Sequence, residues 1–127
     1  MLTGPLAVVP AWRWWTGFFT VAAFAGTMTA WAYLFGLPEF FRLHDKSIHF
    51  STAGLLAFFL DGALRRRRLF ADGPVAVPLA AALVLIPAGI EEFLQRYSAH
   101  RQSSIWDFAA DVAGVLVLIP LSRRVAK

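Results

Sequence analysis

Acidic, basic and histidine side chains recur at helical spacings in three short stretches of this sequence. In chain order they are Asp45, Lys46 and His49; Glu91 and Glu92, with Gln95 and Arg96; and Asp107 and Asp111, with Arg101 in the loop before them. Side chains three or four residues apart lie on the same face of a helix. Each stretch can therefore present several polar groups to one neighbouring element.

Two kinds of chemistry fit these residue types. Lys46, Arg96 and Arg101 could bind phosphate, with Arg101 suited to bidentate contact, while the carboxylates could hold an amine. Alternatively, an imidazole and carboxylates could bind a metal that activates water. The candidate ligands are then His49, Glu92, Asp107 and Asp111, with Glu91 as a general base. One histidine with carboxylates is a permissive set that identifies no particular metal.

The composition indicates the elements that must position these groups. Hydrophobic residues make up 58% of the 127 residues and charged residues only 16%, and the mean hydropathy is +0.60. Soluble domains are roughly half apolar and about a quarter charged, and one membrane span needs about 20 apolar residues. We therefore expect a single-domain, all-α integral membrane protein, an antiparallel bundle of four transmembrane helices over approximately 14–37, 45–64, 75–97 and 104–121.

Two other structures for the apolar blocks are less consistent with the sequence. The blocks are long, rich in Ala, Leu and Phe, and lack the alternation of a membrane β-barrel. The first block could be a cleaved signal peptide, because Arg13 precedes it and Ala23–Ala25 resembles a cleavage site. Its apolar run continues to Leu37, which favours a retained helix.

The distribution of Lys and Arg predicts an orientation. If the helices alternate, one side holds eight basic residues, at 13, 65–68, 123, 124 and 127, and the other side holds four. Cytoplasmic flanks carry the excess, so we expect both termini inside and the protein in the cell (inner, cytoplasmic) membrane. The Arg65–Arg68 run is then a topology anchor on a tight helical turn. Aromatic belts would comprise Trp12, Trp14 and Trp15 inside, and Tyr97 and Trp106 outside.

With this topology the three polar stretches meet at the extracytoplasmic ends of the helices. A charged side chain at the bilayer centre costs about 3 kcal/mol on insertion scales, so these carboxylates should face the bundle interior and pair. Asp111 is the deepest of them. Small residues at Ala53, Ala57, Ala110 and Gly114 would let neighbouring helix backbones approach closely.

Several partners and chemistries are not expected. The net charge is +4, but the basic residues lie between apolar blocks rather than on one binding face, so we expect no nucleic acid. The absence of cysteine excludes disulfides, thiolate metal sites and a cysteine nucleophile. The bilayer is the expected partner, and thin helices with apolar outer faces are compatible with a homo-oligomer.

The two blocks DKSIHF (45–50) and EEFLQRYSAHRQSSIWDFAADVAG (91–114) resemble the VanZ-like family of small bacterial membrane proteins. The family pattern as we identify it has Asp-Lys with a later His, then Glu, Gln, Arg, Asp, Asn and Gly at fixed intervals. The matching residues are Asp45, Lys46 and His49, then Glu92, Gln95, Arg101, Asp107 and Gly114. The sequence departs from the pattern at Asp111, where the family usually has Asn.

The resemblance implies a cell-envelope role without specifying a reaction. The family is named for a protein associated with resistance to glycopeptide antibiotics, chiefly teicoplanin. Three hypotheses follow. The cluster binds a lipid-linked cell-wall precursor, a lipid headgroup or an amphiphilic antibiotic such as a glycopeptide; or it is the site of a membrane-embedded, metal-assisted enzyme; or it is a structural network of ion pairs, such as Arg101 with Asp107.

Overall fold

The structure is a computed structural model, and it describes residues 9–36, 39–69, 77–97 and 105–125. Four long helices dominate the described residues: α1 (Ala11–Phe35), α3 (Asp45–Ala63), α4 (Leu79–Leu94) and α5 (Ile105–Val125). The shorter elements are α2 (Glu39–Leu43), β1 (Arg68–Leu69), β2 (Val77–Pro78) and the 3-10 helix η1 (Gln95–Tyr97). The prediction of a helical protein with four long helices is confirmed.

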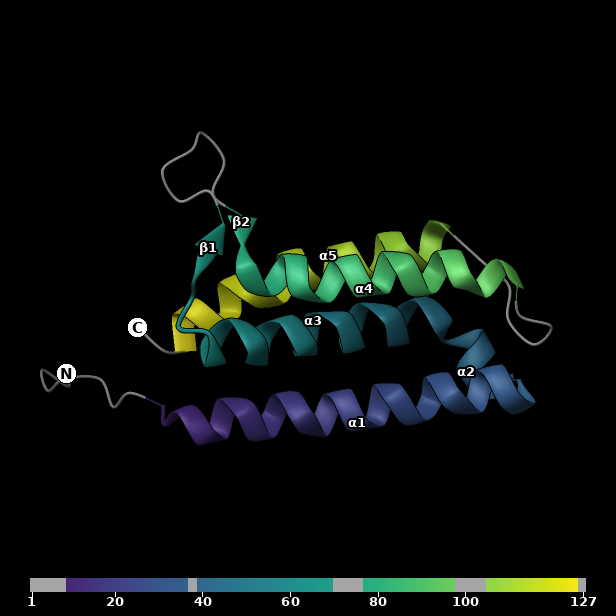
Figure 1. The fold of residues 1–127 in the computed structure, drawn as a ribbon, viewed down its shortest axis with the longest axis horizontal. Coiled ribbons are helices and arrows are strands. Elements are labelled where there is room, and N and C mark those ends of the chain that lie inside the picture. The colour runs from purple at the N-terminus through teal and green to yellow at the C-terminus, as the bar shows by residue number, and fades with distance from the viewer. Residues whose placement is uncertain (1–8, 37–38, 70–76, 98–104, 126–127) are drawn as a thin grey trace, which may run out of the picture.

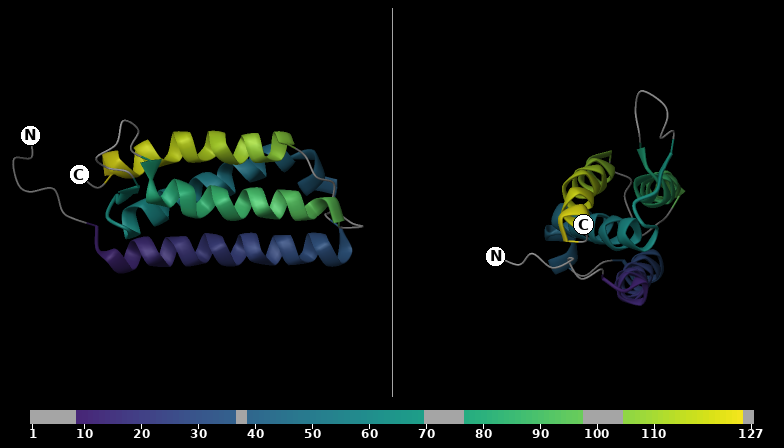
Figure 2. Two further views of the ribbon diagram at one scale, coloured as in Figure 1. Left: turned by 45° about the horizontal axis from the view of Figure 1, so that its top comes forward. Right: turned by 90° about the vertical axis from the view of Figure 1, so that its left-hand side faces the viewer.

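Successive long helices run in opposite directions, side by side (Figure 1). As a result α3 and α5 are parallel, and this pair, which is not adjacent in the chain, makes the most extensive contact in the molecule. Helix α1 lies on the outer side of α3, away from α5 (Figure 2). We call the end where α3 and α5 begin the polar end, and the end where they finish the arginine end.

The helix boundaries follow from glycine and proline. Helix α1 ends at Phe35 because Gly36 adopts a positive φ of 77° and its N–H caps the Ala32 carbonyl, two residues before the predicted end. Helix α4 begins after Pro78 rather than at 75, since Val77 and Pro78 form strand β2. Helix α5 continues through Pro120 to Val125, beyond the predicted end at 121.

The interpretation of the arginine run as a tight helical turn was incomplete. Arg65 and Arg66 adopt left-handed conformations, with φ of 55° and 59°, which end the helical path of α3. Arg68 then begins β1, which pairs antiparallel with β2 in the register Arg68 to Pro78. A short hairpin, which the sequence patterns did not predict, therefore joins α3 to α4.

Glycines bring the parallel pair α3 and α5 into backbone contact. A Cβ on Gly114 would overlap the carbonyl oxygen of Phe50, and a Cβ on Gly54 would lie 2.9 Å from the carbonyl oxygen of Gly114. The core beside this contact contains Ala53, Ala57, Leu60, Ala80, Val84, Val115 and Ile119. Small residues therefore set the distance between these helices, as small residues do in membrane bundles.

Helix α1 packs on α3 through aromatic rings seated on glycines near the arginine end. The Trp14 ring occupies the space that a Cβ on Gly62 would fill, and the Phe59 ring occupies the equivalent space at Gly17. Trp14 is only 5% exposed. The predicted aromatic belt is therefore wrong for Trp14, which packs inside the protein, whereas Trp12 is exposed.

Among the residues that the structure describes, two helices are long and apolar enough to cross a membrane, namely Ala11–Phe35 and the Ile105–Ser122 part of α5. Only 6% of the apolar segment of Ala11–Phe35 is buried within the protein. The buried share of the Ile105–Ser122 segment is 33%. Apolar outer surfaces of this kind are typical of helices that contact lipid.

Candidate functional site

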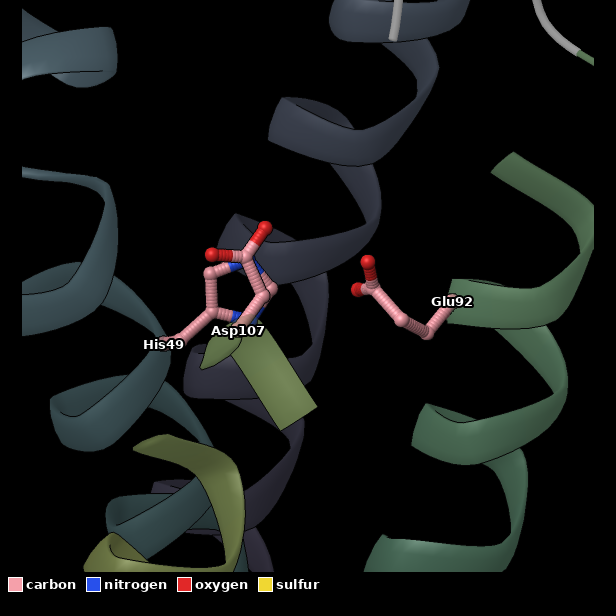
Figure 3. A group of neighbouring side chains, drawn as sticks. All are labelled: His49, Glu92 and Asp107. Atoms are coloured by element: carbon pink, nitrogen blue, oxygen red, sulfur yellow. The ribbon is translucent and has the colours of Figure 1, made fainter. Parts of the chain in front are cut away.

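Polar side chains from three helices converge inside the polar end. Lys46 and His49 lie in the first turns of α3, Glu92 near the end of α4, and Asp107 and Asp111 in the first turns of α5. The three carboxylates are buried. Figure 3 shows the Glu92 carboxylate pointing across the bundle toward His49 and Asp107. The structure thus brings together residues from all three stretches that the sequence singled out.

His49 contacts two carboxylates of α5, one with each ring nitrogen. Its Nδ1 lies 3.0 Å from Asp111 Oδ1, and its Nε2 lies 3.7 Å from Asp107 Oδ2. An ionised carboxylate only accepts hydrogen bonds, so Nδ1 carries the proton donated to Asp111. In the neutral imidazole the Nε2 lone pair then lies on the side of Asp107.

Lys46 forms an ion pair with Asp107 Oδ1 at the rim of this group. The Lys46 side chain is 54% exposed whereas that of Asp107 is 4% exposed, so the lysine extends from a solvent-accessible rim to a buried acid. Asp107 also lies in the first turn of α5, where the helix dipole stabilises a negative charge. Lys46 and the α5 dipole therefore both place positive charge beside the Asp107 carboxylate.

Glu91 belongs to a neighbouring hydrogen-bond group. Gln95 Nε2 donates to Glu91 Oε1 at 2.7 Å and Oε2 at 2.8 Å, across one helical turn. Tyr33 of α1 donates to Glu91 Oε1 at 3.3 Å. These contacts link α1 to α4 at the polar end, and both carboxylate oxygens of Glu91 accept hydrogen bonds in them.

A cavity of about 520 Å³ extends from these polar groups into the bundle, between α1, α3 and α4. Its walls are mainly apolar and include Phe18, Ala22, Met28, Leu56, Leu83 and Val84. His49, Glu91 and Asp111 also line it. It exists because α1 is held near its two ends, by Trp14 and Tyr33, and carries small residues such as Ala22 and Ala25 between them.

Some of the predicted site residues cannot be placed. Arg101 lies outside the described residues, as do the side chains of Asp45 and Arg96. The predicted pair of Arg101 with Asp107 and the proposed phosphate contacts of Arg96 and Arg101 therefore stay predictions.

The sequence interpretation missed a second buried polar contact, at the arginine end. Ser122 Oγ of α5 donates to Asp61 Oδ2 of α3 at 2.7 Å, and both residues are 0% exposed. A signal was present in the sequence, because Asp61 is a carboxylate within an otherwise apolar block. Such a residue needs a polar partner within the bundle.

No known family model, curated protein or solved structure matches this chain. The function must therefore be argued from the site itself.

Proposed function

We propose that this is a four-span integral membrane protein of VanZ-like type that binds an amphiphile, with the apolar chain in the cavity and the polar head at the polar end. The cavity carries this proposal, because it joins a largely apolar space of about 520 Å³ to His49, Glu91 and Asp111. Ligand sites have volumes of about 300–1,000 Å³ and combine apolar walls with a few polar groups.

The apolar exterior supports four spans. Besides α1 and α5, helix α4 carries no charge between Leu79 and Ile90, and it extends into η1. Helix α3 is free of Asp, Glu, Lys and Arg between Lys46 and Asp61, a stretch shorter than a full span, so its charged ends would lie in the membrane interface. Large apolar side chains point outward on three of the helices, among them Phe19, Trp31, Ile86, Ile90, Leu116 and Val117. A bilayer is the solvent that suits these surfaces.

The charges lining the cavity favour an amine-bearing head. Glu91 and Asp111 are the carboxylates that line it, and a carboxylate forms strong charge-assisted hydrogen bonds with an ammonium group. The resemblance to the VanZ-like family suggests three sources of such a group: a lipid-linked cell-wall precursor, a lipid headgroup, or a glycopeptide antibiotic. In the last case the protein would influence glycopeptide susceptibility.

The test is an inventory of amphiphiles that copurify with the protein in mild detergent, measured per mole of protein by mass spectrometry. Ala22→Phe places a ring in the cavity, whereas Ala30→Phe, at an exposed position of the same helix, is the control. Excluding two methylenes costs about 1.6 kcal/mol, which lowers affinity more than about tenfold. We expect Ala22→Phe to lose an amine-bearing amphiphile that wild type and Ala30→Phe retain.

Equal retention by the two variants would contradict binding in the cavity. A bound amphiphile without an amine would contradict the proposed head but leave the cavity in place. If Ala22→Phe loses the ligand while keeping its elution profile and helical content, general unfolding is excluded as the cause.

A further inference from the structure

His49, Glu92 and Asp107 form a group whose geometry goes beyond ion pairing. One candidate ligand atom from each residue, a histidine nitrogen or a carboxylate oxygen, lies within 4.8 Å of the others. Each residue comes from a different helix, and Figure 3 shows the three side chains turned toward a common space. Glu92 and Asp107 are buried, and His49 is half-buried.

We propose that this triad binds a divalent transition metal such as Zn²⁺, with His49 Nε2 and one carboxylate oxygen each from Glu92 and Asp107 as ligands. Two ligand atoms on a tetrahedral zinc ion lie about 3.4 Å apart, given metal–ligand distances of about 2.0–2.2 Å. The 3.7 Å between His49 Nε2 and Asp107 Oδ2 is close to this value. Three protein ligands leave a fourth position open, as in catalytic zinc sites.

The contact between Asp111 and His49 supports the assignment independently of the ligand distances. Metal-binding histidines generally donate the N–H of their other ring nitrogen to a carboxylate or carbonyl, which fixes the tautomer and the ring orientation. Asp111 accepts that bond from His49 Nδ1 at 3.0 Å.

A buried polar atom on α4, the helix that carries Glu92, also points to an additional ligand. Gln95 lies one turn after Glu92 and is 0% exposed, and its Oε1 has no hydrogen-bond partner among the described residues. Buried acceptors of this kind are usually satisfied by water or a ligand.

The inference deepens the proposed function, since a metal here would lie beside the head of the amphiphile, at the polar end of the cavity that His49 lines. The inference rests on the proposed function only for the position of the metal beside the amphiphile head. Metal binding itself can be measured without the amphiphile. Glu91 and Asp111 remain on the cavity side, so the triad and the amine-binding carboxylates are different groups.

The experiment is a calorimetric titration with Zn²⁺ of the purified, untagged protein in detergent, after removal of metals with a chelator. We expect one saturable site per chain in wild type, and a loss of more than about tenfold in affinity for Glu92→Gln and Asp107→Asn. Asp61→Asn, which removes a buried carboxylate at the arginine end, is the matched control and should bind like wild type.

A second variant covers the case in which a triad variant fails to fold. Asp111→Asn keeps an acceptor for His49 Nδ1 and should still bind Zn²⁺, about 10–100-fold more weakly. Absence of a saturable site in wild type, unchanged binding by Glu92→Gln, or equal loss in Asp61→Asn would overturn the proposal. The amphiphile inventory is repeated on metal-free protein. If the amphiphile still copurifies although no Zn²⁺ site is found, the metal proposal fails and the proposed function does not.

Discussion

Buried carboxylates lie near both ends of the contact between α3 and α5, and each accepts a hydrogen bond from the partner helix. Asp111 accepts from His49 at the polar end, and Asp61 accepts from Ser122 at the arginine end. An ion in an apolar interior is tolerated only where such partners replace its hydration. Each acid therefore makes its donor on the other helix important for stability.

Ser122→Ala tests the contact at the arginine end. It removes a donor from the fully buried carboxylate of Asp61, which we expect to lower the free energy of unfolding by about 1–3 kcal/mol. Ser51→Ala, at an exposed position of α3, should change it by less than about 0.5 kcal/mol. Unfolding in mixed detergent micelles measures both, and equal effects of the two variants would show that the hydrogen bond contributes little.

At the scale of the helices, the relation between α3 and α5 is fixed by contacts at both ends and between them. His49 with Asp111 and Asp61 with Ser122 are 62 and 61 residues apart in the chain, and Gly54 contacts Gly114 between them. A constant separation means that the helices are parallel and in one register. Polar pairs at both ends and backbone contact in the middle together disfavour sliding of one helix along the other.

Gly114→Ala tests the middle of this contact. The added methyl group would overlap the Phe50 carbonyl, which is backbone and cannot rotate away, so we expect a loss of about 1–3 kcal/mol or more in stability. Gly26→Ala in α1 is the control, because nothing lies within 4 Å of its Cβ position. There the better helix propensity of Ala should stabilise the helix by up to about 1 kcal/mol.

Thermal unfolding in detergent should therefore move in opposite directions for the two substitutions. If Gly114→Ala unfolds at the wild-type temperature, α3 and α5 are not in backbone contact at this position. The control also shows whether changing any glycine to alanine is enough to alter the transition.

The apolar blocks predicted the long helices because length and lack of charge are properties of each segment alone. The sequence could not show that α3 pairs with α5 rather than with a chain neighbour, since that choice depends on which small residues meet. Gly114 was predicted correctly as a position of close approach between helices, whereas Gly54 was not predicted as one. Asp61 was passed over because its partner, Ser122, is distant in the sequence, and the β1–β2 pair is too short to produce a pattern.

At the scale of the whole molecule, charge is distributed unevenly along the bundle axis. Arg13 is near the start of α1, Arg124 is near the end of α5, and Arg65–Arg68 follow the end of α3, so all of them lie at the arginine end of the bundle (Figure 1). The two buried acids that His49 contacts, Asp107 and Asp111, lie in the first turns of α5, at the polar end. Cytoplasmic flanks carry the excess of Lys and Arg. This asymmetry is the basis for proposing that the polar end faces away from the cytoplasm, where an envelope ligand would reach it.

Cysteine labelling tests that orientation directly, because the chain contains no cysteine and each introduced thiol reports alone. Arg67→Cys places an exposed thiol at the arginine end, and Glu39→Cys places one in α2 at the polar end. With a membrane-impermeant maleimide on spheroplasts, we expect Glu39→Cys to react and Arg67→Cys to react only after permeabilisation. The reverse pattern would put the polar end of the cavity on the cytoplasmic side, where an extracellular glycopeptide could not reach it. Binding of an amphiphile from the inner leaflet would still be possible.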